Sequence, residues 1–253
     1  MTKTILITGG ATGIGFETAK KMILKGVNVV ITGRREQLGL EKAEELKAMA
    51  VDGVQAKFVK NDVTDEQAMR DLIDNIVKDF GSLDYAVNNA GVSLETAMLP
   101  QSDTEKFKQM LDTNVLGVYY GMKYQLQQMQ KQGFGSIVNL CSIAGLNGIP
   151  YTSTYAATKH AVVGMTKSSA LDYAQLGIRI NGVAPGATKT DIIATQLEGN
   201  DPNYDEESIS SMHRMKRLGR PEEIANGIVW LLSDEASFVT GHILSIDGGF
   251  QAK

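Results

Sequence analysis

Short runs of β-branched and aliphatic residues alternate with longer helical patterns along the chain. Such alternation favours a parallel sheet, because parallel strands are joined by long crossover connections that helices usually supply. Helical patterns lie near residues 14–25, 36–50, 65–80, 103–131, 153–176 and 221–233. Seven runs predict strands, at residues 4–9, 27–32, 54–59, 83–88, 136–141, 178–184 and 242–247. The pattern therefore predicts an α/β fold, a doubly wound and mainly parallel seven-stranded sheet with helices on both faces.

Length and composition favour one unit. A chain of 253 residues with 43% apolar content can close one large core, so we expect a single domain over residues 1–253. Residues 195–217 are the one compositional break, polar and weakly periodic. Their place after the sixth strand predicts a substrate lid at about residues 187–217, although a surface insertion would have the same composition.

Charge and cysteine content argue against several classes of protein. A formal net charge of −4 and scattered basic residues give no nucleic-acid footprint, so a small molecule is the expected partner. We find no secretory signal and no apolar run long enough to span a bilayer, which predicts no membrane partner. A lone cysteine, Cys141, fits a reducing cytoplasm. The three histidines and the cysteine lack metal-ligand spacing, so no metal is expected.

The sequence TGGATGIG, from Thr8 to Gly15, directly follows the first strand and opens a helix. Gly9, Gly13 and Gly15 would let the backbone turn tightly and approach a pyrophosphate, which then lies at the positive end of the helix. A glycine-rich turn without a ligand is the alternative. The strand before and the helix after the motif favour a Rossmann-type dinucleotide-binding domain.

A second signal lies in the sequence YAATKHAVVG, from Tyr155 to Gly164. Residues at i and i+4 share one face of a helix, so Tyr155 and Lys159 point the same way. Tyr119 and Lys123 have the same spacing. The spacing alone therefore does not identify a site.

At this point the chain resembles the short-chain dehydrogenase/reductase family, and the resemblance covers essentially its whole length. The spacing Gly-x-x-x-Gly-x-Gly differs from the Gly-x-Gly-x-x-Gly of larger dehydrogenases. Tyr119 lacks a serine 13 residues upstream, where Lys106 stands, so its pair with Lys123 is interpreted as incidental. The further motifs follow in order: NNAG at residues 88–91, NVLG from Asn114, Ser142, Tyr155 13 residues later, Lys159 four residues after that, then Pro185 and Gly186, with Thr188 and Thr190.

The resemblance implies four catalytic residues. Tyr155 would exchange a proton with the substrate oxygen, and Lys159 would lower the pKa of the phenol and bind the nicotinamide ribose. One ammonium about 4 Å away stabilises a phenolate by about 4 kcal/mol at an effective dielectric constant near 20, which is adequate. Ser142 would hold the substrate oxygen, and Asn114 would keep a water in a proton path. Singly, Ser142 could be a helix cap and Asn114 a solvent-facing residue of the helix.

The residues at the end of the predicted second strand indicate which nicotinamide cofactor is preferred. NAD-specific folds place a carboxylate there, but this chain has Gly33 followed by Arg34 and Arg35, whose guanidinium groups suit a 2′-phosphate. NADP is therefore favoured and NAD stays possible, since Thr12 supplies no second basic group and Glu36 offsets charge. The expected cofactor-binding residues are Gly9, Thr12, Gly13, Ile14, Gly15, Gly33, Arg34, Arg35, Asp62, Val63, Asn89, Ala90, Gly91, Tyr155, Lys159, Pro185, Gly186, Thr188 and Thr190.

The predicted reaction is hydride transfer between the cofactor and a hydrophobic ketone or secondary alcohol. Alternatives are a 3-oxoacyl-thioester (acyl-carrier-protein) reductase, for which residues 211–220 are the only basic candidate patch, and a non-catalytic nucleotide-binding regulatory protein. His213 is a weaker substrate-contact candidate, whereas His160 and Cys141 are interpreted as packing or surface residues. The expected substrate-binding residues are Ser142, Leu94, Leu146, Tyr155 and Ile192.

The C-terminal part of the chain carries an apolar predicted strand and the helix with Trp230. An uncovered strand at a sheet edge tends to pair or to be covered. Members of the family that the chain resembles usually form tetramers through such elements, so a homotetramer is predicted.

Overall fold

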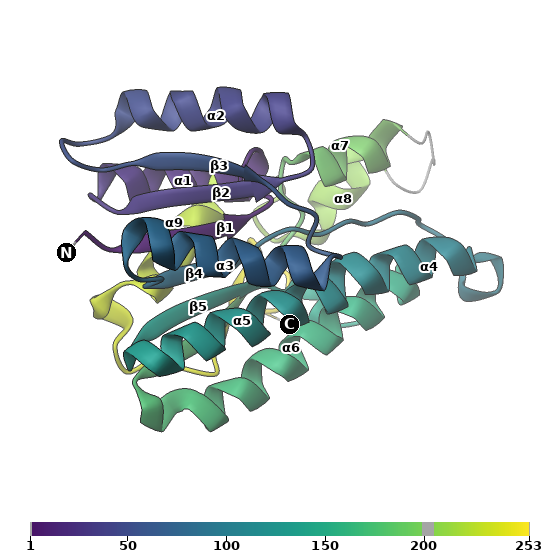
Figure 1. Ribbon diagram of the computed structural model, residues 1–253. Coiled ribbons are helices and arrows are strands. Elements are labelled where there is room, and N and C mark those ends of the chain that lie inside the picture. The colour runs from purple at the N-terminus through teal and green to yellow at the C-terminus, as the bar shows by residue number, and fades with distance from the viewer. Residues whose placement is uncertain (1, 199–204, 253) are drawn as a thin grey trace.

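The computed structural model describes residues 2–198 and 205–252, and in this part of the chain seven parallel strands form one sheet (Figure 1). Their order is β3-β2-β1-β4-β5-β6-β7, with parallel register throughout. The expected α/β class and strand number are confirmed. The strands are β1 (Thr4–Thr8), β2 (Asn28–Gly33), β3 (Ala56–Lys60), β4 (Tyr85–Asn88), β5 (Gly135–Leu140), β6 (Ile178–Pro185) and β7 (Ile243–Ile246).

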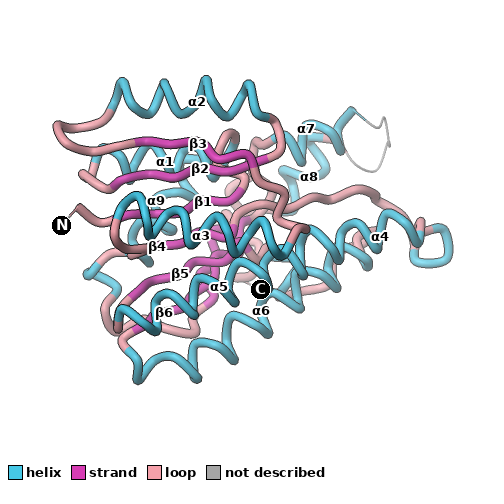
Figure 2. The backbone as a smooth tube through the Cα atoms, in the orientation of Figure 1, coloured by secondary structure: helices cyan, strands magenta, loops and turns pink. Residues whose placement is uncertain are grey.

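Helices cover both faces of the sheet. Helices α1, α2 and α9 pack on one face, and α3, α5 and α6 pack on the other. Helices α7 and α8 lie beyond the carboxyl ends of the strands (Figure 2). The helices are α1 (Gly13–Leu24), α2 (Glu36–Met49), α3 (Glu66–Phe80), α4 (Thr104–Leu111), α5 (Gly117–Gln132), α6 (Ser153–Tyr173), α7 (Asp191–Glu198), α8 (Glu206–Met212) and α9 (Pro221–Leu232).

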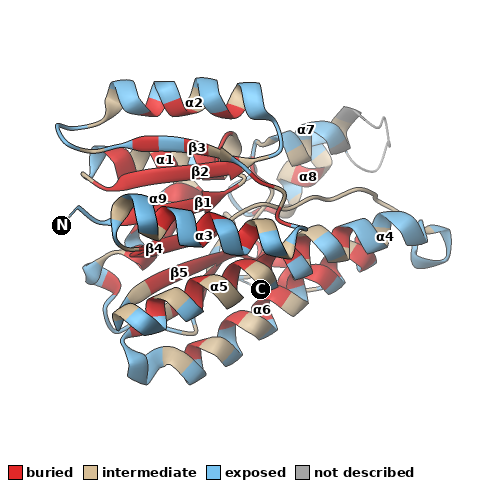
Figure 3. Ribbon diagram, viewed as in Figure 1, coloured by how far each residue is buried: buried red, intermediate tan, exposed pale blue. Residues whose placement is uncertain are grey.

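The first strand shows why the central sheet is uniformly apolar. Ile5 and Ile7 belong to the core beneath α1 and α9, whereas Leu6 belongs to the core beneath α3, α5 and α6. Successive side chains of a strand point to opposite faces, so a strand with helices on both sides must be apolar at every position. Figure 3 shows the resulting buried centre between exposed outer helix surfaces.

Two predicted segments differ from the structure. The helix expected over residues 103–131 is interrupted by a π-helical turn at Asp112–Leu116, which separates α4 from α5. Residues 195–217, where the sequence is polar and weakly periodic, contain the end of α7 and the whole of α8, and residues 199–204 of this segment lie outside the described part of the chain. Helix α8 begins at a capping residue, Asp205, whose carboxylate accepts a hydrogen bond from the Ser208 N–H. Short helices with one buried side have little periodicity to detect.

The sheet order places a ligand site at the middle of its carboxyl edge. Strand β1 lies between β2 and β4, so the chain leaves β1 toward one side of the sheet and later continues from β4 toward the other. In an open parallel sheet, the loops diverge at this point and leave a crevice outside the strand ends. The glycine motif after β1 and the NNAG sequence after β4 border it.

Candidate active site

A cleft of about 530 Å³ opens at the carboxyl ends of the strands. This volume is in the range of small-molecule and cofactor sites. Among the residues expected to bind the cofactor, Gly15 is outside its wall. The others line it: Gly9, Thr12, Gly13, Ile14, Gly33, Arg34, Arg35, Asp62, Val63, Asn89, Ala90, Gly91, Tyr155, Lys159, Pro185, Gly186, Thr188 and Thr190.

The glycine motif has the backbone that a dinucleotide requires. Gly9 and Gly13 have φ angles of +62° and +53°, a region that residues with a Cβ atom rarely adopt. A Cβ on Gly15 would lie 2.6 Å from the Gly9 carbonyl oxygen, so this glycine allows α1 to pack closely. Within the described residues, Thr12 makes no side-chain capping bond to α1. The first turn of α1 therefore fits a pyrophosphate.

The NNAG turn is joined to the glycine motif by Thr8. The Thr8 hydroxyl oxygen accepts hydrogen bonds from the backbone N–H groups of Asn89 (3.0 Å) and Ala90 (3.1 Å). The Asn89 amide donates in return to the carbonyl oxygens of Thr8 (2.9 Å) and Gly9 (3.0 Å). Thr8 was not among the predicted site residues, although it is the first residue of the TGGATGIG motif.

The arginines after β2 differ in their contacts. Arg35 Nη2 lies 3.3 Å from both the Thr12 hydroxyl oxygen and an oxygen of Asp191. Arg35 thus supplies a cation beside Thr12, the position where the sequence lacks a basic side chain. Glu36 pairs with Lys60 at 3.0 Å. The carboxylate that was expected to offset the arginines is therefore partly neutralised by this lysine.

Ser142 and Tyr155 reach the cleft from different elements. Ser142 follows β5 with φ 146° and ψ 157°, a strained combination for a residue with a side chain. Its Oγ accepts a hydrogen bond from the Ala144 N–H at 3.1 Å, so the capping alternative describes part of its role. Tyr155 is half-buried on the first turns of α6. Both side chains line the same wall.

Lys159 lies one helical turn after Tyr155 and is only 5% exposed. Its Nζ donates to the Leu140 carbonyl oxygen at 2.9 Å and lies 5.8 Å from the centre of the Tyr155 ring. Burial lowers the pKa of the Lys159 ammonium to about 8. The group is thus mainly cationic at neutral pH and faces the tyrosine in a region of low dielectric constant.

Asn114 lies in the π-helical turn and is fully buried, so the solvent-facing alternative is wrong. Its Oδ1 accepts a hydrogen bond from the Val92 N–H, and its Nδ2 donates to the Val92 carbonyl oxygen, both at 2.8 Å. Nδ2 also contacts Thr158 Oγ1 at 3.1 Å. Asn114 thus joins the loop after β4 to α6 behind Lys159. Its water-holding role stays a prediction.

The substrate end of the cleft is mainly apolar. Leu94 and Ile192 line it as expected, whereas Leu146 lies outside the wall and packs against the core beneath α6. The wall also contains four apolar side chains that were not named individually, although residues 143–151 and 187–217 were expected at the pocket rim: Ile149, Ile193, Ile209 and Met212. The spacing of three residues between Ile209 and Met212 is the helical signal that could have identified the last two.

Cys141, His160, Tyr119 and Lys123 have ordinary packing or surface contacts. Cys141 is 2% exposed, and burial raises the pKa of its thiol to about 11, which suits a small apolar residue. The His160 side chain is exposed, and its Nδ1 lies 2.9 Å from the Ala156 carbonyl oxygen. Tyr119 is 44% exposed, and Lys123 forms an ion pair with Glu66 at 2.7 Å.

Over residues 2–198 and 205–252, we find no group of three or more His, Cys, Asp or Glu side chains arranged to hold a metal ion. In the same part of the chain, the helices are too short or too polar to cross a membrane.

Comparison with known proteins agrees with this geometry. The sequence family described as enoyl-(acyl carrier protein) reductase matches residues 9–251. A 2,5-dichloro-2,5-cyclohexadiene-1,4-diol dehydrogenase of Sphingobium indicum is 39% identical, over 99% of this chain and 97% of the relative. A cyclohexanol dehydrogenase of an Acinetobacter species is 38% identical, over 99% of this chain and 96% of the relative.

Among solved structures, ElxO with bound NADP is 42% identical over the full length of both chains, with a TM-score of 0.90. The similarity of sequence and of fold therefore covers the whole cleft, from the glycine motif to helices α7 and α8. Together with the ordered motifs, it shows that this chain belongs to the short-chain dehydrogenase/reductase family of oxidoreductases.

Proposed function

We propose that this protein is an NADP-dependent oxidoreductase that interconverts a hydrophobic, alicyclic ketone and its secondary alcohol. The observation that carries the proposal is the meeting of Ser142, Tyr155 and Lys159 on one wall of a cleft whose other end is the glycine motif. This arrangement supports hydride transfer, with the cofactor at one end and an apolar pocket at the other.

The bound nicotinamide supplies the hydride in reduction and accepts it in alcohol oxidation. In the reductive direction, the Tyr155 hydroxyl donates its proton to the carbonyl oxygen as the C–O bond order falls. The nearby Lys159 cation stabilises the phenolate that remains, and the Ser142 hydroxyl donates a hydrogen bond to the same substrate oxygen. The oxidation runs these steps in reverse.

NADP is supported by the charge at the end of β2. The Arg35 guanidinium lies beside Thr12, and Gly33 places no carboxylate where a 2′-phosphate would be repelled. Arg34 lines the same part of the cleft with its side chain exposed. A planar guanidinium pair suits a phosphate, and the similarity to ElxO with bound NADP supports the same preference.

The alicyclic substrate is supported by the pocket wall. Leu94, Ile149, Ile193 and Met212 offer apolar contacts, which suit a compact ring without charge. Two similar dehydrogenases are named for alcohols on six-membered rings. We include the segment at about 187–217 in the proposal as a substrate lid on a single domain, because its helices α7 and α8 contribute Ile193, Ile209 and Met212.

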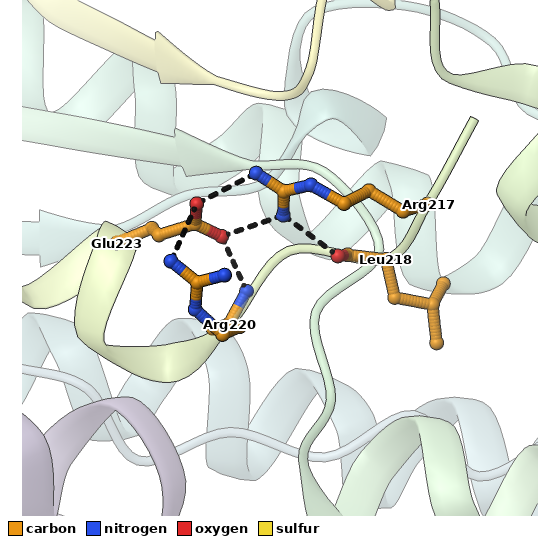
Figure 4. Close-up of polar contacts among 4 residues, drawn as sticks. All are labelled: Arg217, Leu218, Arg220 and Glu223. Carbon is orange, nitrogen blue, oxygen red and sulfur yellow. Dashed lines mark hydrogen bonds and ion pairs between the residues drawn. The ribbon is translucent and has the colours of Figure 1, made fainter. Parts of the chain in front are cut away.

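The matched family's description favours an acyl-carrier-protein substrate as the second candidate. This hypothesis assumes an acidic carrier protein, which would bind to free basic groups near the cleft of this chain. Figure 4 shows instead that Arg217 and Arg220 both turn to Glu223. Arg217 binds Glu223 through two hydrogen bonds of 2.8 and 2.7 Å, and these bonds lower the pKa of the carboxyl group to about 2. The patch at residues 211–220 is thus partly neutralised.

Oxidation of NADPH and of NADH by the purified protein tests the proposal. The substrates are cyclohexanone, an open-chain ketone of similar size, and acetoacetyl-pantetheine as the thioester. We expect the highest kcat/KM with cyclohexanone and NADPH. Fastest reduction of the thioester would favour the acyl-thioester alternative. Tight NADPH binding without turnover of any compound would favour the non-catalytic alternative.

We also propose a homotetramer in the cytoplasm. Strand β7 is the last strand of the sheet, with Phe238 fully exposed and Trp230 38% exposed in the segments before it. An apolar surface beside a sheet edge is a frequent subunit contact. Light scattering at micromolar concentration should give four times the mass of one chain, and the mass of a monomer would refute the assembly.

A further inference from the structure

One buried histidine at the cleft has no part in the proposed hydride transfer. His213 follows the last turn of α8 and is 2% exposed, yet its side chain lines the cleft. Its ring packs 5.7 Å from the ring of Phe250 near the C-terminus. His213 therefore lies where the lid, the loop after β6 and the C-terminal turn meet.

The contacts of the imidazole define which ring nitrogen donates and which accepts. His213 Nδ1 lies 2.7 Å from the Asp247 carbonyl oxygen, which can only accept a hydrogen bond. The Ala187 backbone N–H donates to His213 Nε2 at 3.2 Å. Only a neutral ring that carries its proton on Nδ1 satisfies both contacts. The backbone of two separate segments is thus joined through one side chain.

The loop held in this way contains the PG motif. The Gly186 N–H donates to the Ile246 carbonyl oxygen at 3.0 Å, so the loop is bound to the end of β7 just before the histidine contact. A Cβ atom on Gly186 would lie 2.6 Å from His213 Cε1 and 3.0 Å from Asp247 Cα. The glycine is therefore required by the imidazole packed against it.

The carboxylate of Asp247, whose backbone carbonyl group contacts His213, is engaged elsewhere. The Asp247 carboxylate accepts hydrogen bonds from the N–H groups of Gly249 at 2.9 Å and Gln251 at 3.1 Å. The Asp247 carboxylate thus stabilises the C-terminal turn. The backbone carbonyl oxygen of the same residue accepts the hydrogen bond from His213 Nδ1. The turn offers His213 a fixed acceptor.

We infer that His213 is a positioning residue that sets the loop at residues 185–190 for cofactor binding and couples it to helix α8. The inference rests on the proposed function, since this loop is proposed to hold the nicotinamide end of the cofactor. Ile209 and Met212, on the helix that His213 follows, line the substrate end of the cleft. One imidazole thus connects the substrate wall with the cofactor wall.

Matched substitutions separate the two hydrogen bonds. In His213→Gln the amide oxygen can replace Nε2 as the acceptor for Ala187, and in His213→Asn the amide nitrogen can replace Nδ1 as the donor to Asp247. His213→Phe keeps the ring and removes both bonds. The readouts are the Kd of NADPH from fluorescence titration, which needs no turnover, and hydrogen exchange of the Ala187 amide.

We expect His213→Gln to bind NADPH within about twofold of wild type. His213→Asn and His213→Phe should bind it about tenfold more weakly, with faster exchange at Ala187 and a KM for NADPH that changes more than kcat. Rescue by glutamine but not by asparagine would assign the effect to the Ala187 bond. Equal NADPH affinity in all three variants would overturn the inference, even if the protein reduced no ketone.

A double-mutant cycle of His213 and Gly186 tests the same inference if these variants unfold. Gly186→Ala should weaken NADPH binding, because its methyl group meets the imidazole. Adding His213→Ala removes that contact and leaves the one with Asp247 Cα, so the double variant should lose less affinity than the sum of the two single losses. Additive losses would show that His213 and the loop act independently. Thermal unfolding of each variant checks the fold.

Discussion

The two ends of the cleft are held in different ways. Around the glycine motif and the proposed catalytic wall, Thr8, Asn114 and Lys159 are all buried, and each makes hydrogen bonds to the backbone or to a side chain of another segment. At the substrate end, none of the described side chains of α7 is buried, and Ile209 is the buried residue of α8. An ion pair joins Asp191 of α7 to Arg35 at the cofactor end, and both side chains are more than 60% exposed.

This contrast separates chemistry from substrate choice. Buried polar groups that are hydrogen-bonded to one another form a rigid network. The core therefore fixes the positions of the groups proposed to transfer the proton. An exposed ion pair contributes little stability, and helices with one buried side can shift at low cost. We therefore expect substitutions at the proposed catalytic wall to change kcat strongly and substitutions in the proposed lid to change KM modestly.

The strongest test of this contrast removes the proposed acid. Tyr155→Phe keeps the aromatic ring on α6 and removes the proton, so kcat should fall by at least about 10²-fold, the scale of a lost general acid. Binding of NADPH should be nearly unchanged. Tyr119→Phe is the matched control, because Tyr119 has the same spacing to a lysine but lies exposed on α5. Near-normal turnover of the Tyr155 variant would refute the mechanism.

The next test concerns the cofactor end. Gly33→Asp introduces a carboxylate at a position where an added Cβ meets no atom within 4 Å, so the fold should tolerate it. Combined with Arg34→Ala, it should shift the ratio of kcat/KM values from NADPH toward NADH by at least about tenfold, or about 1.4 kcal/mol. Lys57→Ala, which removes a cation paired with Asp79, serves as the control.

A wild-type enzyme that prefers NADH would contradict the proposed role of the arginines. Arg35→Ala then distinguishes the two side chains, since Arg35 is the one that contacts Thr12. A larger loss of NADPH affinity in Arg35→Ala than in Arg34→Ala would assign the phosphate to Arg35.

Lys159 makes the catalytic wall sensitive to pH. Its ammonium has a pKa of about 8 in the folded protein, below the value of 10.5 for the free side chain, because it is buried. Between these values the unfolded chain binds more protons than the folded one, so stability rises with pH. Relative to Lys159→Met, the wild type should gain about 1 kcal/mol between pH 7 and pH 9.

Urea denaturation of the two cofactor-free proteins at both pH values measures this difference. Other titrating groups are shared and cancel. A difference that stays constant or falls with pH would show that the buried ammonium is not destabilising in the folded protein.

The smallest effect on the kinetics is expected from a substitution in the proposed lid. Ile193→Ala removes an apolar contact from the cleft wall, and partial loss of such a contact costs about 0.7 kcal/mol, or about threefold in KM for the ketone. Leu197→Ala on the same helix is the control, because Leu197 is not part of that wall. A kcat loss as large as that of Tyr155→Phe would remove the contrast between the two ends.

The interrupted helix after β4 illustrates the limit of sequence patterns. The region 103–131 has helical periodicity, but a π-helical turn inside it rotates Asn114 onto the backbone of Val92. Periodicity records which face is apolar and does not record one extra residue in a turn. A buried amide is needed here because it pairs with the backbone N–H and carbonyl groups of Val92, which lies in a loop distant in the chain.

Arg179 gives the same lesson. From β6, its guanidinium donates to the carbonyl oxygens of Leu231 (2.7 Å) and Leu232 (3.0 Å) at the end of α9. In sequence it is one basic residue in an apolar strand. Only the packing of α9 against β6 shows that it caps a helix whose last carbonyl groups have no partner in the helix itself.

The sequence by itself determined the local and ordered features of this protein. These features are the seven strand patterns, the glycine motif, and the serine, tyrosine and lysine at set intervals. Each depends on residues that are close together in the chain, so the sequence alone shows it. The tertiary structure decided which of those residues share one wall, that Arg35 contacts Thr12, and that His213 joins two loops. These contacts join residues far apart in the chain, so their partners exist only after the sheet and helices have packed.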